Sequence, residues 1–151
     1  MQSFFIKEDG SLWGMGNNSH GRLGNGQSYA VQSTPIQIVE SGVVDVSAGS
    51  NHTAFVKLDG SAWTMGDNVN GRLGDGTSTQ RWSPVKIFDS GVIRVYASAQ
   101  NSFFLKTDGT LWGCGDNNRG QLGEKSSEAI NSPIEIAENV LDASSRSYTL
   151  F

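Results

Sequence analysis

Groups able to carry out acid–base or nucleophilic chemistry are few in this sequence and do not cluster. The chain has two histidines, His20 and His52, and one cysteine, Cys114. Catalysis of this kind needs a base within hydrogen-bond reach of a nucleophile or of a substrate proton, and no motif brings these residues together. A single thiol also excludes an internal disulfide. We therefore predict no catalytic residue, no cofactor site and no enzyme activity.

Two segments rich in Asp and Asn bear some similarity to metal-binding loops. They are Asp67-Asn-Val-Asn-Gly71 and Asp116-Asn-Asn-Arg-Gly120. A calcium loop of the EF-hand type needs its glycine at the sixth position and a glutamate further on, whereas glycine stands at the fifth position here. Asn and Asp side chains commonly bond the backbone of turns. The sequence therefore favours structural turns and predicts no metal site.

Both segments belong to a unit that occurs three times. The copies begin at the Asp-Gly pairs 9–10, 59–60 and 108–109, and each contains Trp-x-x-Gly and a later Gly-x-Leu-Gly turn. Three prolines follow at a spacing of 49 residues: Pro35, Pro84 and Pro133. Cys114 takes the place that methionine holds in the other two copies, which favours a small core residue over a nucleophile. The histidines fall at different positions of the unit and form no repeated site.

Each unit is predicted to form four short strands, and helical periodicity is absent. An Asp-Gly turn between two apolar runs predicts a tight hairpin in which both central residues can adopt positive φ. The first strands are expected at 3–7, 53–57 and 102–106. Outer strands are expected to begin just after the prolines, at 36–39, 85–88 and 134–137. A fourth run is expected to complete each unit, at 43–48, 92–97 or 140–143.

Four short antiparallel strands in a repeat of this length are typical of a propeller blade. The sequence thus predicts an all-β fold with three β-propeller blades of four antiparallel strands, in a single repeat domain covering residues 1–151. A blade buries its faces only against neighbouring blades. One tryptophan recurs at the same place in each unit, which favours blade packing over a ligand-stacking platform for Trp13, Trp63 and Trp112.

The unit resembles the repeat of the regulator-of-chromosome-condensation family. The specific parts are Trp-x-x-Gly-[Asp/Asn]-Asn and Gly-[Arg/Gln]-Leu-Gly, and the resemblance covers essentially the whole chain. It implies a β-propeller, usually of seven blades in this family. Its members include a nucleotide exchange factor for a small GTPase, a plant ultraviolet sensor and a bacterial β-lactamase inhibitor. The exchange factor's wedge-like insertion and the sensor's extra tryptophans have no counterpart here, and Ser50 stands at the matching tryptophan position.

Three blades are fewer than the four or more of a closed propeller ring. Residues 146–151 align with 51–56 and with 1–6, so the chain starts and stops within the same strand of the repeat. Two explanations stay open: a piece of a longer propeller, or head-to-tail association of two chains into a six-bladed ring. An open stack exposes apolar faces and strand edges, so we expect a homodimer, with the strand at 3–7 taking the shared place.

Composition narrows the kind of partner. The net charge is −4, so no general basic field exists to hold nucleic acid, and no nucleic-acid partner is expected. Neither a leader nor an apolar run of membrane-spanning length is present, and both a bacterial cytoplasmic and an extracellular location stay open.

Arg22 and Arg72, matched by Gln121, lie in the Gly-x-Leu-Gly turn. Bonding of loop carbonyls between blades is favoured for them over binding an acidic partner.

The loops 25–34, 75–83 and 124–132 differ most between the units. Aromatic and arginine residues on such loops often anchor protein interfaces, which singles out Tyr29, Arg81 and Trp82 as partner-binding candidates. Trp82 has no tryptophan counterpart at Ser33 or Ser132. The sequence therefore favours a protein-interaction scaffold that uses loops on one face. The alternatives are a regulator of a specific enzyme, either an exchange factor or an inhibitor, and a propeller fragment without independent function.

Overall fold

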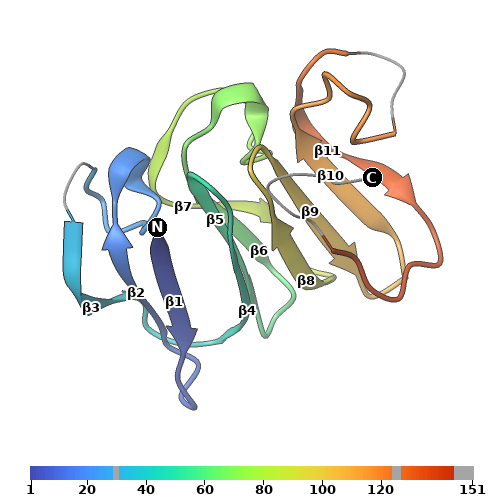
Figure 1. The fold of residues 1–151 in the computed structure, drawn as a ribbon. Coiled ribbons are helices and arrows are strands. Elements are labelled where there is room, and N and C mark those ends of the chain that lie inside the picture. Colours follow the sequence, from blue (N-terminus) through green and yellow to red (C-terminus); the bar gives the residue numbers. More distant parts are fainter. Residues whose placement is uncertain (29–30, 124–126, 145–151) are drawn as a thin grey trace.

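The computed structural model describes residues 1–28, 31–123 and 127–144, and it confirms the all-β class (Figure 1). Those residues form eleven strands and two short 3-10 turns, η1 (Ser19–Gly21) and η2 (Val69–Gly71). The strands are β1 (Gln2–Ile6), β2 (Leu12–Asn17), β3 (Val31–Val39), β4 (Val43–Ala48), β5 (His52–Lys57), β6 (Ala62–Gly66), β7 (Arg81–Phe88), β8 (Val92–Ala97), β9 (Asn101–Lys106), β10 (Leu111–Gly115) and β11 (Ile130–Ala137).

The strands form three antiparallel sheets, here called blade 1 (β1-β2-β3), blade 2 (β4-β5-β6-β7) and blade 3 (β8-β9-β10-β11). The sheets stand side by side in chain order (Figure 1). β4 and β8 are the inner strands, and they pack beside one another. The long loops before β3, β7 and β11 lie at one end of the blades, called the loop end, and the Asp-Gly hairpins lie at the other.

The predicted grouping of strands into blades was wrong in its phase. The fourth run of each unit does not complete its own sheet but begins the next one, because β4 pairs with β5 and β8 pairs with β9. Blade 1 consequently has three strands in the described part of the chain, with β1 at its edge. The run at 140–143 is not a strand, although the Val140 amide donates to the Gly109 carbonyl at 2.9 Å, as Val92 does to Gly60 at 3.0 Å.

The Asp-Gly hairpins form as predicted, but their turn type differs from the expectation. Only the glycine has positive φ, 76° at Gly10. The Gly10 amide donates to the Lys7 carbonyl at 2.9 Å, and the Lys7 amide donates to Ser11 at 3.0 Å. This is a three-residue loop closed by a left-handed glycine. Asp9 stays outside the left-handed region because its carboxylate instead accepts the Ser11 amide and hydroxyl.

Each proline lies inside its outer strand rather than before it. β3 begins four residues ahead of Pro35, and β7 begins three residues ahead of Pro84. These strands are sheet edges, and the pairing register shifts at this point, between Gly14 and Gly16 in blade 1. A residue without an N–H fits an edge strand at a bulge without the loss of a ladder hydrogen bond.

The apolar core lies between the blades. One buried cluster joins Leu12 of blade 1 to Val43, Phe55 and Met65 of blade 2. A second joins blade 2 to blade 3 and consists of Ala54, Val56, Ala62, Val92, Val95, Phe104 and Cys114. Adjacent blades therefore bury the faces that they turn toward each other, as stacked repeats require.

Candidate protein-interaction surface

The Asp- and Asn-rich loops at the loop end are held by their own side chains. Asn18 Oδ1 accepts the Leu23 amide at 3.0 Å, and Asn18 Nδ2 donates to the Gln27 carbonyl at 3.0 Å. Asn68 repeats the first bond with Leu73 at 3.0 Å. These side-chain amides therefore hydrogen-bond the backbone of the turns, as expected. Among the described residues, no group of three or more His, Cys, Asp or Glu side chains could hold a metal ion.

The two turn arginines link consecutive blades, which supports their structural interpretation. Arg22 is 6% exposed and donates to the Ser50 carbonyl and to Asn51 Oδ1, both at 2.7 Å. Arg72 is 4% exposed, donates to the Ala99 carbonyl at 3.1 Å and lies 3.3 Å from the Asp67 carboxylate. Burial lowers the pKa of both guanidinium groups, and nearby carboxylates oppose this.

Trp82 lies near the start of β7, where blade 2 contacts the turn of blade 1. Its backbone and ring cover Gly21, where an added Cβ would stand 2.6 Å from the indole. The Trp82 carbonyl accepts the Gly26 amide at 2.8 Å. Trp82 nevertheless remains 45% exposed. It is thus fixed at its base while part of the indole faces solvent.

The structural counterpart of Trp82 at the next blade boundary is Asn131, and the expected match with Ser132 was wrong by one residue. Asn131 covers Gly71 as Trp82 covers Gly21, and its carbonyl accepts the Gly76 amide at 2.9 Å. The same backbone position therefore carries a half-exposed indole at one boundary and a short amide at the other.

Arg81 precedes Trp82 in β7 and is anchored by an ion pair. Its Nε lies 2.6 Å from Asp75 Oδ2, while 37% of the arginine side chain stays exposed. Burial alone raises the pKa of Asp75, but hydrogen bonds from Thr77 and Arg81 outweigh it and lower that pKa. The third predicted partner-binding residue, Tyr29, lies outside the described residues.

His20 and Gln80 join these residues, and sequence reasoning did not associate them with Trp82. His20 Nδ1 lies 3.4 Å from Gln80 Nε2, and Trp82 Nε1 donates to Gln80 Oε1 at 3.5 Å. His20 adopts a left-handed backbone, with φ at 64°. We call His20, Gln80, Arg81 and Trp82 the loop-end patch. Its members come from blades 1 and 2. Because His20 and Gln80 are 60 residues apart in the sequence, no local sequence pattern indicates that they meet.

The two other side chains that could act as a base or a nucleophile, His52 and Cys114, are buried. His52 Nε2 lies 3.0 Å from Ser102 Oγ, and burial together with Arg72 lowers the pKa of His52 to about 3. Burial raises the pKa of the Cys114 thiol to about 12. A neutral imidazole and a protonated thiol in these positions act as packing groups.

The repeated tryptophans take equivalent positions in the three blades. Each indole N–H donates to the hydroxyl two residues earlier, for instance Trp13 to Ser11 at 2.9 Å. Trp63 and Trp112 pack against the two buried clusters between blades. Trp13 instead stacks on Phe5, with ring centroids 6.4 Å apart, on the face of blade 1 that no described blade covers.

Membrane insertion through a helix finds no support: within residues 1–28, 31–123 and 127–144, no helix has the length and apolar character to cross a bilayer.

Solved structures with the same fold extend well beyond this chain. Human WBSCR16 has 25% identity and a TM-score of 0.78, over 90% of this chain and 37% of its own. Prp20p from Saccharomyces cerevisiae, described with its binding to Gsp1p and histones, has 18% identity and a TM-score of 0.78, over 91% and 36%. A structure of Kap60 bound to yeast RCC1 (Prp20) gives 18% and 0.79, over 91% and 35%. The chain thus spans little more than a third of these proteins.

A search of curated proteins finds no significant match. The family described as "Regulator of chromosome condensation (RCC1) repeat" matches residues 9–56, 59–105 and 108–145, and a second description of the same repeat matches 43–72 and 92–121. These ranges carry the hairpins, turn arginines and tryptophans described above. Because the match extends over most of the sequence, this chain belongs to the regulator of chromosome condensation (RCC1) repeat family.

Proposed function

We propose that the chain binds a protein partner through the loop-end patch and carries out no catalysis of its own. The observation that carries the proposal is Trp82, an indole that is fixed at its base and 45% exposed. Anchored aromatic and arginine side chains supply much of the binding energy of protein interfaces because they lose little conformational entropy on binding. Prp20p, a solved relative of the same fold, is described as binding Gsp1p and histones.

The test replaces Trp82 by asparagine, the residue at the equivalent position 131. Ile93→Asn is the matched control, since Ile93 is an apolar residue with 46% exposure on the inner strand β8. Wild type and both variants are immobilised, and the proteins captured from the source extract are quantified by mass spectrometry. We expect specific partners to be lost on Trp82→Asn and retained on Ile93→Asn. Equal capture by all three proteins would refute a partner site at the patch.

A second proposal concerns self-association into a six-bladed ring. The uncovered face of blade 1 carries Ser3, Phe5 and Trp13, at the positions that Thr53, Phe55 and Trp63 hold in blade 2. In blade 2 the Thr53 hydroxyl donates to the Arg22 carbonyl across the boundary at 2.9 Å, and Phe55 is buried against blade 1. We propose that blade 3 of a second copy covers this face of blade 1, and that blade 3 of the first copy covers the same face of blade 1 in the second.

Light scattering on a sizing column measures this directly. A mass of twice 16.2 kDa is expected for the ring, and replacement of Phe5 by aspartate is expected to shift it to the monomer. A wild-type monomer at high concentration would refute the ring and favour a fragment of a longer propeller.

A further inference from the structure

The inner edge of blade 1 carries no further strand within the described part of the chain. β5 pairs with β4 and β9 pairs with β8 along this edge, whereas β1 pairs with β2 alone. β1 is accordingly more exposed than its equivalents: Phe5 is 37% exposed, whereas Phe55 and Phe104 are buried. An open strand edge flanked by apolar side chains readily accepts another strand. Blade 1 is thus one strand short of the other two blades.

Residues 139–144 take the course of an inner strand, although no described strand pairs with them. Asn139 has a left-handed backbone with φ at 58°, as does Gly42 at 80°, the residue that leads into β4. The Val140 amide then donates to the Gly109 carbonyl at 2.9 Å, the same hairpin bond with which β4 and β8 begin. These residues therefore leave blade 3 in the way that β4 leaves blade 1.

The neighbouring inner strand, β8, holds this segment in place. The Ala143 amide donates to the Tyr96 hydroxyl at 3.3 Å, and that hydroxyl donates to Asp142 at 2.6 Å. The Val95 amide, at the position of Ala143, likewise donates to the inner strand before it, through Asp45 at 3.0 Å. The segment is thus fixed along one side, as β8 is on β4, while no described strand takes up its sheet edge.

The open edge of β1 and the segment 139–144 cannot meet within one chain. β1 belongs to the first blade, the segment follows the third, and blade 2 stands between them (Figure 1). In a ring of two copies, however, the segment of each copy arrives beside blade 1 of the other. The strand that fits the edge is therefore one from a second copy of this chain.

We infer that residues 139–144 of one copy pair antiparallel with β1 of a second copy and supply the missing inner strand of its blade 1. The inference deepens the six-bladed ring proposed above and rests on it. It adds an exchange of strands to the packing of blade faces, because each copy then contains a sheet that is complete only with residues of its partner.

The two complete inner edges give the register of this pairing. Val43 lies opposite Lys57 in blade 2, and blade 3 repeats the pair, so Val140 is expected opposite the partner's Lys7. The Lys57 amide and carbonyl both bond within their own Asp-Gly hairpin. The pair at this position is therefore of the non-hydrogen-bonded kind, in which the two Cα atoms lie about 4.5 Å apart.

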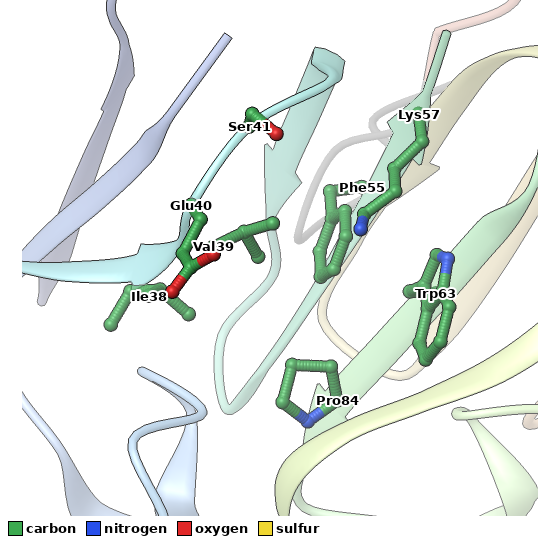
Figure 2. Close-up of a pocket in the computed structure, with 8 residues that line it drawn as sticks. All are labelled: Ile38, Val39, Glu40, Ser41, Phe55, Lys57, Trp63 and Pro84. Atoms are coloured by element: carbon green, nitrogen blue, oxygen red, sulfur yellow. The ribbon is translucent and has the colours of Figure 1, made fainter. Parts of the chain in front are cut away.

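The packing of the blade faces agrees with this register. Figure 2 shows the completed case between blades 1 and 2, where Phe55 lies between Val39 and Trp63. Ala137 stands in blade 3 at the position that Val39 holds in blade 1. In the ring, the partner's Ala137 would therefore lie beside Phe5. The strand pairing and the face packing thus place the second copy in the same way.

Disulfide trapping in the full chain tests the register. Lys7→Cys and Val140→Cys are co-expressed as two separate chains and oxidised, because a Cα separation of about 4.5 Å suits a disulfide. We expect a linked species of twice 16.2 kDa that contains one chain of each kind. The native Cys114 is buried, with its thiol pKa raised to about 12, and does not compete.

Gln37→Cys replaces Lys7→Cys in the control, since Gln37 is an exposed residue of the outer edge strand β3. Linkage of Val140→Cys to Lys7→Cys alone supports strand exchange, and equal linkage to both positions, or none, would overturn it. The mass of the wild type separates the two ways of failing. A dimer without the specific disulfide would refute strand exchange and leave the ring, whereas a monomer would refute both.

Hydrogen exchange of backbone amides gives a second readout, in which the wild-type dimer is compared with the Phe5→Asp monomer. The Leu58 amide donates to the Gly42 carbonyl at 2.7 Å, and Glu8 stands at the position of Leu58. The Glu8 amide is expected to exchange about 100-fold more slowly in the dimer, because the partner's Asn139 carbonyl accepts its hydrogen. The Leu58 amide is the internal reference and should exchange equally in both proteins. Glu8 exchange as fast in the dimer as in the monomer would overturn the inference.

Discussion

The two blade boundaries share one backbone arrangement and differ in the side chains that complete it. At both, a hydroxyl of the following blade donates to a turn-arginine carbonyl, Thr53 to Arg22 at 2.9 Å and Ser102 to Arg72 at 2.7 Å. The first boundary contains Gln2 where the second contains His52. Hydrogen bonds to backbone therefore fix how the blades stack, while the remaining positions are free to carry a titratable group or a buried ion pair.

The largest expected difference concerns the turn arginines. Arg72 is paired with Asp67, and both are about 4% exposed. At the first boundary, Asn17 stands at the position of Asp67, so Arg22 has no carboxylate of its own loop. Loss of one member of a buried ion pair costs about 3–5 kcal/mol. We therefore expect Arg72→Ala to lower the free energy of unfolding by that amount, and Arg22→Ala by about 2 kcal/mol through lost hydrogen bonds.

Urea unfolding followed by tryptophan fluorescence measures both losses. The double substitution Arg72→Ala with Asp67→Asn is the control, because it removes the unpaired carboxylate and should recover part of the stability. Equal losses for the two single variants would show that the ion pair adds nothing beyond the carbonyl contacts.

A smaller difference is expected in the response to pH. Burial and Arg72 lower the pKa of His52 to about 3, from 6.5 in the unfolded chain. Between these values the unfolded chain binds the extra proton, so stability is complete above pH 6.5 and falls by roughly 1.4 kcal/mol per pH unit below it. His52→Gln installs the residue of the first boundary, which does not titrate.

From pH 7 to pH 4.5, the wild type should therefore lose about 2–3 kcal/mol more than His52→Gln. Parallel urea titrations at the two pH values give the difference directly, and the carboxylates common to both proteins cancel. Identical pH dependence in the two proteins would mean that His52 takes up a proton as readily in the folded chain as in the unfolded chain, and it would refute the lowered pKa.

The smallest expected effect is at Val39. A phenylalanine here buries additional apolar surface against the half-buried Trp63, and we expect a gain of about 1 kcal/mol. Thermal unfolding of Val39→Phe is compared with that of Leu12→Ala/Val39→Phe, which reproduces the Ala62–Phe88 pair of the second boundary. A loss of stability in Val39→Phe, recovered in the double variant, would show that the two positions share one volume.

Features that depend on neighbours in the chain were predictable from the sequence. The three hairpins and the outer place of the proline-containing strands follow from residue types within a few positions of each other, although each strand begins ahead of its proline. The tight turn was identified correctly, although its geometry was not, because an Asp-Gly pair is compatible with more than one loop length. The Asp9 carboxylate selects the longer loop by bonding Ser11.

Features that depend on how units stack were not predictable in the same way. A run such as 43–48 has the same residue pattern whether it pairs with the strands of its own unit or with those of the next unit. The sequence analysis therefore assigned this strand to the wrong blade. The neighbourhood of His20, Gln80 and Trp82 likewise arises only when blade 1 contacts blade 2.

The forward pairing of β4 and β8 has a consequence for how such a protein can change in length. Because each inner strand comes from the preceding unit, the boundary between sequence units falls inside a sheet rather than between sheets. A genetic duplication or deletion of one whole period therefore adds or removes one blade wherever the breakpoints fall, and it leaves no internal sheet incomplete. Recombination between units can thus alter the number of blades without disturbing the strand pairing on which each one depends.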